Sequence, residues 1–170
     1  MYLDANLNFS NAQAITATAP STSVIDLAGL GTGNTMTNII GNATVWGQDI
    51  GVGDSPGQPK IEVAINTAFL TLTGLTIDFQ GAPDNGSGSP GTYVTYASSG
   101  EILLASLGVG VVFKIDVPEI QPEGGPLPRF LRLNYTVAGS NATAGAITAN
   151  IIRDRQDYVA KYYASGFAVA

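Results

Sequence analysis

The sequence predicts an all-β fold: a two-sheet β-sandwich with jelly-roll topology and extended arms at both ends of the chain. Two observations predict it. Apolar and polar residues alternate with a period of two in one segment after another, which is typical of half-buried strands. Gly- and Pro-rich turn signals separate these segments and give roughly eight to ten short strands with hardly any helix. Long loops between the strands favour a jelly roll over an up-and-down barrel.

The clearest alternation covers residues 129–152, RFLRLNYTVAGSNATAGAITANII. Apolar residues occupy every second position on both halves of this segment, and polar residues fill most positions between them. We expect the two halves to pair as a β-hairpin with the apolar set facing the core. That set includes Leu131, Leu133, Tyr135, Val137, Ile147, Ala149 and Ile151.

The N-terminal part is expected to contain a polar arm and two strands. Residues 1–14 form the arm, in which Ser10 followed by Gln13 is compatible with one capped helical turn. The alternative is an extended arm that leads directly into a strand at 15–19. A second short strand is expected at 23–27.

The middle of the chain is irregular at first and then regular. Residues 28–57 are expected to be a glycine-rich inserted loop region with one further strand near 39–46. Alternation resumes at Ile61 and continues, but its phase slips at Thr73 and Gly74. We interpret the slip as a β-bulge, which adds one residue to a strand and restores its apolar face.

Three further strands are expected at 93–97, 101–107 and 109–117. The preceding segment GSGSPG, residues 86–91, fits the pattern G-x-G-x-x-G, but Pro90 lies inside it and a strand follows it. Dinucleotide binding requires a helix at that point, so we interpret the segment as a mobile loop.

Length and composition limit the function. A chain of 170 residues is expected to form a single domain. It has no Cys and no His, which excludes a disulfide framework and a Ser-His-Asp triad. Seven Lys and Arg residues with a net charge of −6 do not supply a basic stripe for nucleic acid. No secretory signal or apolar run of about 20 residues is present, so we expect a soluble protein made in a cytoplasm, with no membrane partner.

Acidic residues offer two weak indications of chemistry. Asp49, Asp54 and Asp84 lie in glycine-rich loops and have the oxygen ligands that Ca²⁺ prefers, but they lack EF-hand spacing. Glu62 and Asp78 are compatible with neighbouring positions on one sheet, where two acids can hydrolyse glycosides. Solvated surface carboxylates are the simpler interpretation of both groups. We therefore predict no enzyme, no metal and no cofactor.

Aromatic and basic residues indicate binding. Trp46 and Tyr93 are candidates for a sugar-stacking platform, and Tyr96 and Tyr135 are expected in the core or half-buried in strands. Residues 153–170 are expected to be a C-terminal arm, either with one or two helical turns or extended. This arm contains the densest basic cluster and three tyrosines, a composition that suits a protein interface. The predicted partner contacts are Arg153, Arg155, Tyr158, Lys161, Tyr162 and Tyr163.

The segment at 129–152, followed by YYASGF, resembles the small capsid cement (decoration) proteins of tailed bacteriophages. The N-terminal segment YLDANLNFSNAQAITATAPSTSVIDL is similar to the start of that family, and IEVAINTAF and LTIDFQ resemble its middle strands. The sequence departs from the family at residues 28–48, where a nearly direct link from VIDL to the segment DIG-x-G at 49–53 is expected.

The resemblance implies a jelly-roll subunit that self-associates, as a dimer first and a trimer as the alternative. It also implies that the protein clamps neighbouring major capsid protein subunits on the outer surface of the virion, after synthesis in the host bacterial cytoplasm. It implies no catalysis and no cofactor. The alternative function is a carbohydrate-binding jelly-roll module or a virion adhesin.

Overall fold

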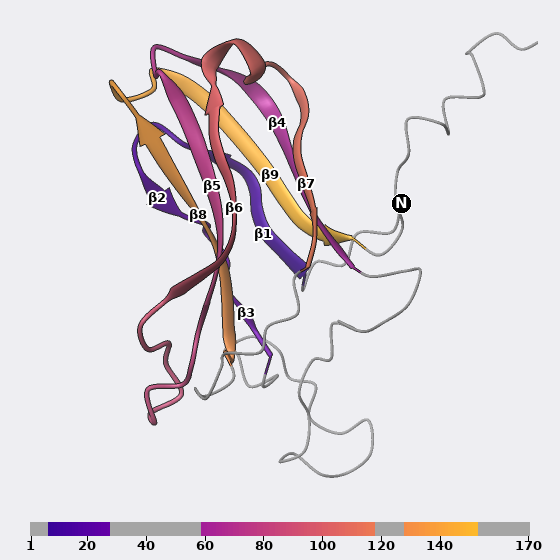
Figure 1. Cartoon of the computed structure of the whole chain (residues 1–170), viewed down its shortest axis with the longest axis vertical. Helices are drawn as coiled ribbons and strands as arrows, with labels where there is room; N and C mark the ends of the chain where they lie inside the picture. Colours follow the sequence, from indigo (N-terminus) through magenta and orange to yellow (C-terminus); the bar gives the residue numbers. More distant parts are fainter. Residues whose placement is uncertain (1–6, 28–58, 118–127, 153–170) are drawn as a thin grey trace, which may run out of the picture.

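The computed structural model describes residues 7–27, 59–117 and 128–152, and these form two antiparallel sheets packed face to face (Figure 1). The first sheet has the strand order β1-β9-β4-β7, and the second has the order β2-β8-β5-β6 with β3 also beside β8. The strands are β1 (Asn8–Ala14), β2 (Ala19–Pro20), β3 (Ile25–Asp26), β4 (Lys60–Leu70), β5 (Gly74–Ala82), β6 (Val94–Leu103), β7 (Gly110–Asp116), β8 (Phe130–Ala138) and β9 (Ala144–Ile152).

The connections follow jelly-roll topology. Within the described ranges, β5 and β6 are consecutive strands that pair with each other. The strands β2 and β3 are two short pieces that pair with different parts of β8, along the edge that does not pair with β5. All the remaining connections between consecutive strands pass from one sheet to the other, so the chain wraps around the sandwich. The predicted two-sheet β-sandwich is confirmed, whereas the predicted C-terminal arm at 153–170 lies outside the described residues.

The predicted hairpin at 129–152 is wrong in its pairing. Strand β8 pairs with β5 in the second sheet, whereas β9 pairs with β4 in the first. Residues 139–143 therefore cross between the sheets and do not form a hairpin turn. The alternation was a correct guide to the buried face, because Leu133 and Ile147 both reach the core, but from opposite sheets. A period of two fixes the face of a strand and carries no information about its partner.

The β-bulge predicted at Thr73 and Gly74 is also absent. The chain leaves β4 after Leu70 and enters β5, in the other sheet, at Gly74. Thr71 makes this crossing with φ of 74°. The phase of the alternation changes because a new strand begins there.

The N-terminal region is more regular than expected. Asn8–Ala14 is strand β1, so these residues are neither an arm nor a helical turn, and residues 1–6 lie outside the described residues. The register of β1 against β9 shifts between Ser10 and Gln13, where Ala12 has φ of 47°. The strand expected at 15–19 is reduced to Ala19–Pro20.

The two strands expected at 93–97 and 101–107 are one strand, β6, followed by a short 3-10 turn at Leu104–Ser106. Gly100 has φ of 64° inside β6, and the register against β5 shifts between Asp78 and Thr76. The glycine that looked like a turn signal therefore lies at an irregularity within a continuous strand. The strand expected at 109–117 is confirmed as β7.

The core fills the space between the sheets. Phe9 of β1 and Phe79 of β5 meet edge to face, with ring centroids 6.3 Å apart. Elsewhere in the core, Gly145 of β9 packs against Phe69 of β4. A glycine is required at position 145, because a Cβ would lie 2.3 Å from the ring of Phe69. The largest fully buried side chains are Tyr135, Phe9, Phe79, Ile15, Ile61, Ile65, Leu72, Leu75, Ile77, Leu107, Leu131 and Leu133.

Candidate functional site

The predicted partner contacts and several other candidates lie outside the described residues. These are Arg153, Arg155, Tyr158, Lys161, Tyr162 and Tyr163, together with Trp46, Asp49 and Asp54. The contact predictions therefore stay predictions. The whole inserted loop region at 28–57 lies outside the described residues as well.

The acidic pair considered for hydrolysis does not form. Glu62 belongs to β4 and Asp78 to β5, which lie in different sheets, so the expectation that they share a sheet is wrong. Glu62 is only 8% exposed and forms an ion pair with Lys114, whose Nζ lies 2.8 Å from Glu62 Oε2. Within the described ranges, no group of three His, Cys, Asp or Glu side chains is arranged to hold a metal ion.

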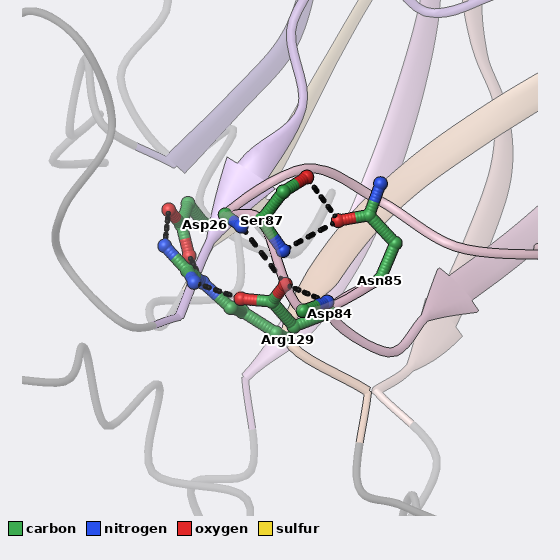
Figure 2. Close-up of polar contacts among 7 residues, drawn as sticks. Asp26, Asp84, Asn85, Ser87 and Arg129 are labelled. Carbon is green, nitrogen blue, oxygen red and sulfur yellow. Dashed lines mark hydrogen bonds and ion pairs between the residues drawn. The ribbon is translucent and has the colours of Figure 1, made fainter.

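One charged cluster joins three segments that are distant in the sequence (Figure 2). The guanidinium of Arg129, just before β8, donates from Nε to Asp26 Oδ1 at 2.8 Å and from Nη2 to Asp26 Oδ2 at 2.9 Å. Its Nη1 donates to Asp84 Oδ2. The side chain of Arg129 is 18% exposed. This bidentate clasp holds the end of β3 and the loop after β5 against the start of β8.

Asp84 also organises its own loop. Its Oδ1 accepts hydrogen bonds from the backbone N–H groups of Gly86 at 2.7 Å and Gly88 at 3.0 Å. The Gly88 hydrogen bond is the largest cause of a lowered pKa of Asp84, to which Gly86 and Arg129 contribute. Asp26 is the largest cause of a raised pKa of Arg129. Both carboxylate oxygens of Asp84 are thus engaged by the protein itself.

The loop at residues 84–90 consequently has a defined hydrogen-bonded shape, and its expected mobility stays a prediction. Asn85 Oδ1 accepts from the N–H of Ser87 at 2.9 Å and from its hydroxyl at 2.6 Å, as Figure 2 shows. Asp84 and Pro90 form an isolated antiparallel bridge across the loop. The strand β6 follows the loop, in agreement with the argument against dinucleotide binding.

A second polar cluster lies on the outer face of the β8-β5-β6 sheet. Arg132 of β8 and Gln80 of β5 are directly opposite each other, and Gln80 is opposite Thr95 of β6. Tyr93, just before β6, places its ring under the guanidinium of Arg132, with 3.5 Å from Cζ to the ring centroid. Burial raises the pKa of Tyr93, although Arg132 acts in the opposite direction, so the phenol is neutral at pH 7. We call Arg132, Gln80, Thr95 and Tyr93 the outer arginine cluster.

Two tyrosine predictions are confirmed. Tyr135 is fully buried in the core, and Tyr96 is partly buried and packs against it. Of the two residues of the candidate sugar platform, only Tyr93 is described, and Arg132 occupies one face of its ring. This contact leaves one face of Tyr93 for stacking on a sugar. Sequence reasoning missed both charged clusters, since each combines residues more than 50 positions apart.

The fold defines a two-sheet jelly-roll protein. Most Lys and Arg side chains of the described residues form ion pairs that link neighbouring strands and loops. A comparison with family models identifies a match to Bbp16 over residues 9–151, and the chain belongs to the Bbp16 family. No curated protein matches the sequence. Among the described residues, no helix has the length and apolar character needed to cross a membrane.

Proposed function

We propose that this protein is a structural virion protein that binds the outside of a phage capsid and cements neighbouring major capsid protein subunits. The resemblance of residues 129–152 and of the N-terminal segment to cement proteins carries the proposal. It receives support from the fold, because that resemblance implies a jelly roll and the described residues have this topology. The proposal makes the protein a binding protein and not an enzyme.

The physical character of the described body suits this task. A sandwich with a continuous apolar core resists deformation, because close-packed interiors have low compressibility. The Arg129 clasp adds an ion-paired link between loops at one end. Cementing a shell requires a rigid subunit with several simultaneous contacts, and such contacts reinforce one another through effective concentration.

The proposed contacts are the basic and aromatic side chains of the C-terminal arm, from Arg153 to Tyr163. A symmetric homo-oligomer, a dimer first and a trimer as the alternative, presents this arm more than once to the shell. The proposed location is the outer capsid surface, after synthesis in the host bacterial cytoplasm.

The test is co-sedimentation of the purified full-length chain with intact capsids of the phage that encodes it. We expect saturable binding at a copy number set by the symmetry of the shell, and bound capsids that withstand more heat than undecorated ones. Absence of binding to intact capsids under conditions that keep the chain folded would contradict the proposal. A glycan array provides the second arm, since saturable sugar binding without capsid binding would favour the carbohydrate-binding alternative.

A further inference from the structure

Among the Lys and Arg side chains of the described residues, Arg132 differs from the others because it lacks an ion pair. Lys60 is paired with Asp116, Lys114 with Glu62, and Arg129 with two carboxylates. Arg132 is the remaining cation of the described residues, and it forms no ion pair with any of them. In a chain of net charge −6, the charge of Arg132 is therefore available to an acidic group of another molecule.

Arg132 is held in one orientation. Its Nε donates to Gln80 Oε1 at 2.9 Å, and Gln80 Nε2 donates to Thr95 Oγ1 at 3.2 Å. The second bond fixes which end of the Gln80 amide faces Arg132. The ring of Tyr93 covers one face of the guanidinium, at 3.5 Å from Cζ. Three strands therefore contribute to holding one side chain on the outer face of the sheet.

This arrangement leaves the terminal nitrogens Nη1 and Nη2 without a hydrogen-bond partner among the described residues. Two parallel N–H groups in a planar fork match the two oxygens of a carboxylate. Because the side chain is already oriented, little conformational entropy is lost when a ligand binds. We propose that the outer arginine cluster is a docking site for a carboxylate side chain of a partner protein.

A protein carboxylate fits better than a nucleic acid phosphate. Binding to a nucleic acid backbone requires several cations along a track, whereas Arg132 is the single unpaired cation among the described residues of this face, and Asp78, two positions from Gln80 on β5, adds a negative charge. A single oriented arginine suits one carboxylate of a protein surface. The identity of the partner as the major capsid protein rests on the proposed function, but the carboxylate preference of Arg132 does not.

The first experiment uses the full-length chain alone, with sodium acetate as the probe and sodium chloride at equal ionic strength as the reference. Side-chain ¹⁵N NMR follows the Nε signals of Arg132 and Arg129 and the amide of Gln80. We expect acetate to shift the Arg132 and Gln80 signals saturably and to leave Arg129 unchanged, because Asp26 and Asp84 already occupy its guanidinium nitrogens. Equal shifts at both arginines, or none at Arg132, would overturn the docking site.

The second experiment measures capsid binding by variants. Arg132→Lys keeps the charge but removes the fork, and we expect about fivefold weaker binding, the size of an exposed ion pair. Tyr93→Leu removes the stacking ring and should weaken binding in the same direction. Lys60→Gln, which removes a positive charge on the other sheet, is the matched control and should bind like the wild type.

The two experiments separate the two proposals. An acetate response at Arg132 without any capsid binding by the wild type supports the carboxylate site and contradicts the cement function. Wild-type affinity in Arg132→Lys, with normal capsid binding, contradicts the assignment of this cluster to the capsid contact.

Discussion

The hydroxyl of Tyr135 lies 2.8 Å from the hydroxyl of Ser10, and this contact joins the two sheets through the core. Ser10 Oγ also lies 2.7 Å from Gln13 Oε1, which only accepts hydrogen bonds. Ser10 therefore donates its proton to Gln13, and Tyr135 must be the donor to Ser10. Gln13 in turn donates from Nε2 to the carbonyl of Pro20 at 2.8 Å, so the network extends from β8 through β1 to β2.

Replacing Tyr135 with phenylalanine should destabilise the fold by about 1–2 kcal/mol, because a buried hydrogen bond is lost while ring packing is retained. Urea unfolding followed by circular dichroism measures the change. Tyr96→Phe serves as the control, since Tyr96 is only partly buried, and it should remain near the wild-type midpoint. A Tyr135→Phe midpoint equal to the wild type would show that the contact contributes nothing.

The same tyrosine should make the protein sensitive to high pH. Burial raises the pKa of Tyr135 above its ordinary value, so the unfolded chain releases this proton first as the pH rises. Stability is therefore lost above about pH 10, where an unfolded tyrosine ionises. The wild type should lose stability more steeply than Tyr135→Phe between about pH 10 and 11. Parallel pH profiles would contradict this role.

Ala12→Gly should stabilise the protein, by about 1 kcal/mol or less, because Ala12 has φ of 47° and glycine adopts such angles without a Cβ clash. Thermal unfolding measures the gain. Thr71→Gly is the informative comparison at φ of 74°. There the threonine hydroxyl donates to the carbonyl of Asn141 and accepts from the N–H of Thr143, so we expect no gain. A lower melting temperature for Ala12→Gly would contradict the strain argument.

The Asp84 contacts should fail in acid. Hydrogen bonds from Gly88 and Gly86 and the charge of Arg129 lower the pKa of Asp84 in the folded protein. Its contribution is therefore complete above the unfolded value, about 4, and is lost as the pH falls through the lower folded value. Asp84→Asn should be less stable than the wild type at pH 7, and the difference should shrink below about pH 4. A difference that persists unchanged at pH 2 would exclude this titration as its cause.

Removing residues 154–170 should weaken capsid binding and leave the β fold intact. The described sandwich ends at Ile152, so its strands and core do not include the deleted residues. Co-sedimentation measures the binding, and circular dichroism of the same sample reports the fold. Replacing Tyr158, Tyr162 and Tyr163 with serine in the full-length chain is the milder counterpart. Undiminished binding by the shortened chain would remove the arm from the proposed contact.

The sequence was a good guide to the buried faces and a poor guide to the pairing. Leu131, Leu133, Tyr135 and Ile147 are buried as the alternation predicts. The predicted hairpin failed because two strands that face one core from opposite sheets show the same alternation as two paired strands. In a jelly roll most consecutive strands lie in opposite sheets, so proximity in the sequence is misleading there.

The candidate site was harder to predict for the same reason. Arg132 and Gln80 occupy outward positions that the alternation indicates, but their contact depends on β8 and β5 being neighbours. Arg129 and Asp26 are 103 positions apart, and nothing local to either residue indicates the pairing. Asp84 was recognised as a loop carboxylate, yet its partners are an arginine and backbone amides and not a metal ion.

The pairing of β1 with β9 has a consequence for synthesis. Asn8 lies opposite Asn150, so the first strand of the described body finds its partner only after about 140 further residues have been made. At about 5–20 residues per second, synthesis of these residues takes roughly 7–28 s, and β1 lacks its partner strand for that time. The sandwich therefore closes only after β9 has been made, and its closure is a late step of folding. Until then the apolar face of β1 lacks its neighbouring strand, and chaperone binding during this interval should raise the yield of folded protein.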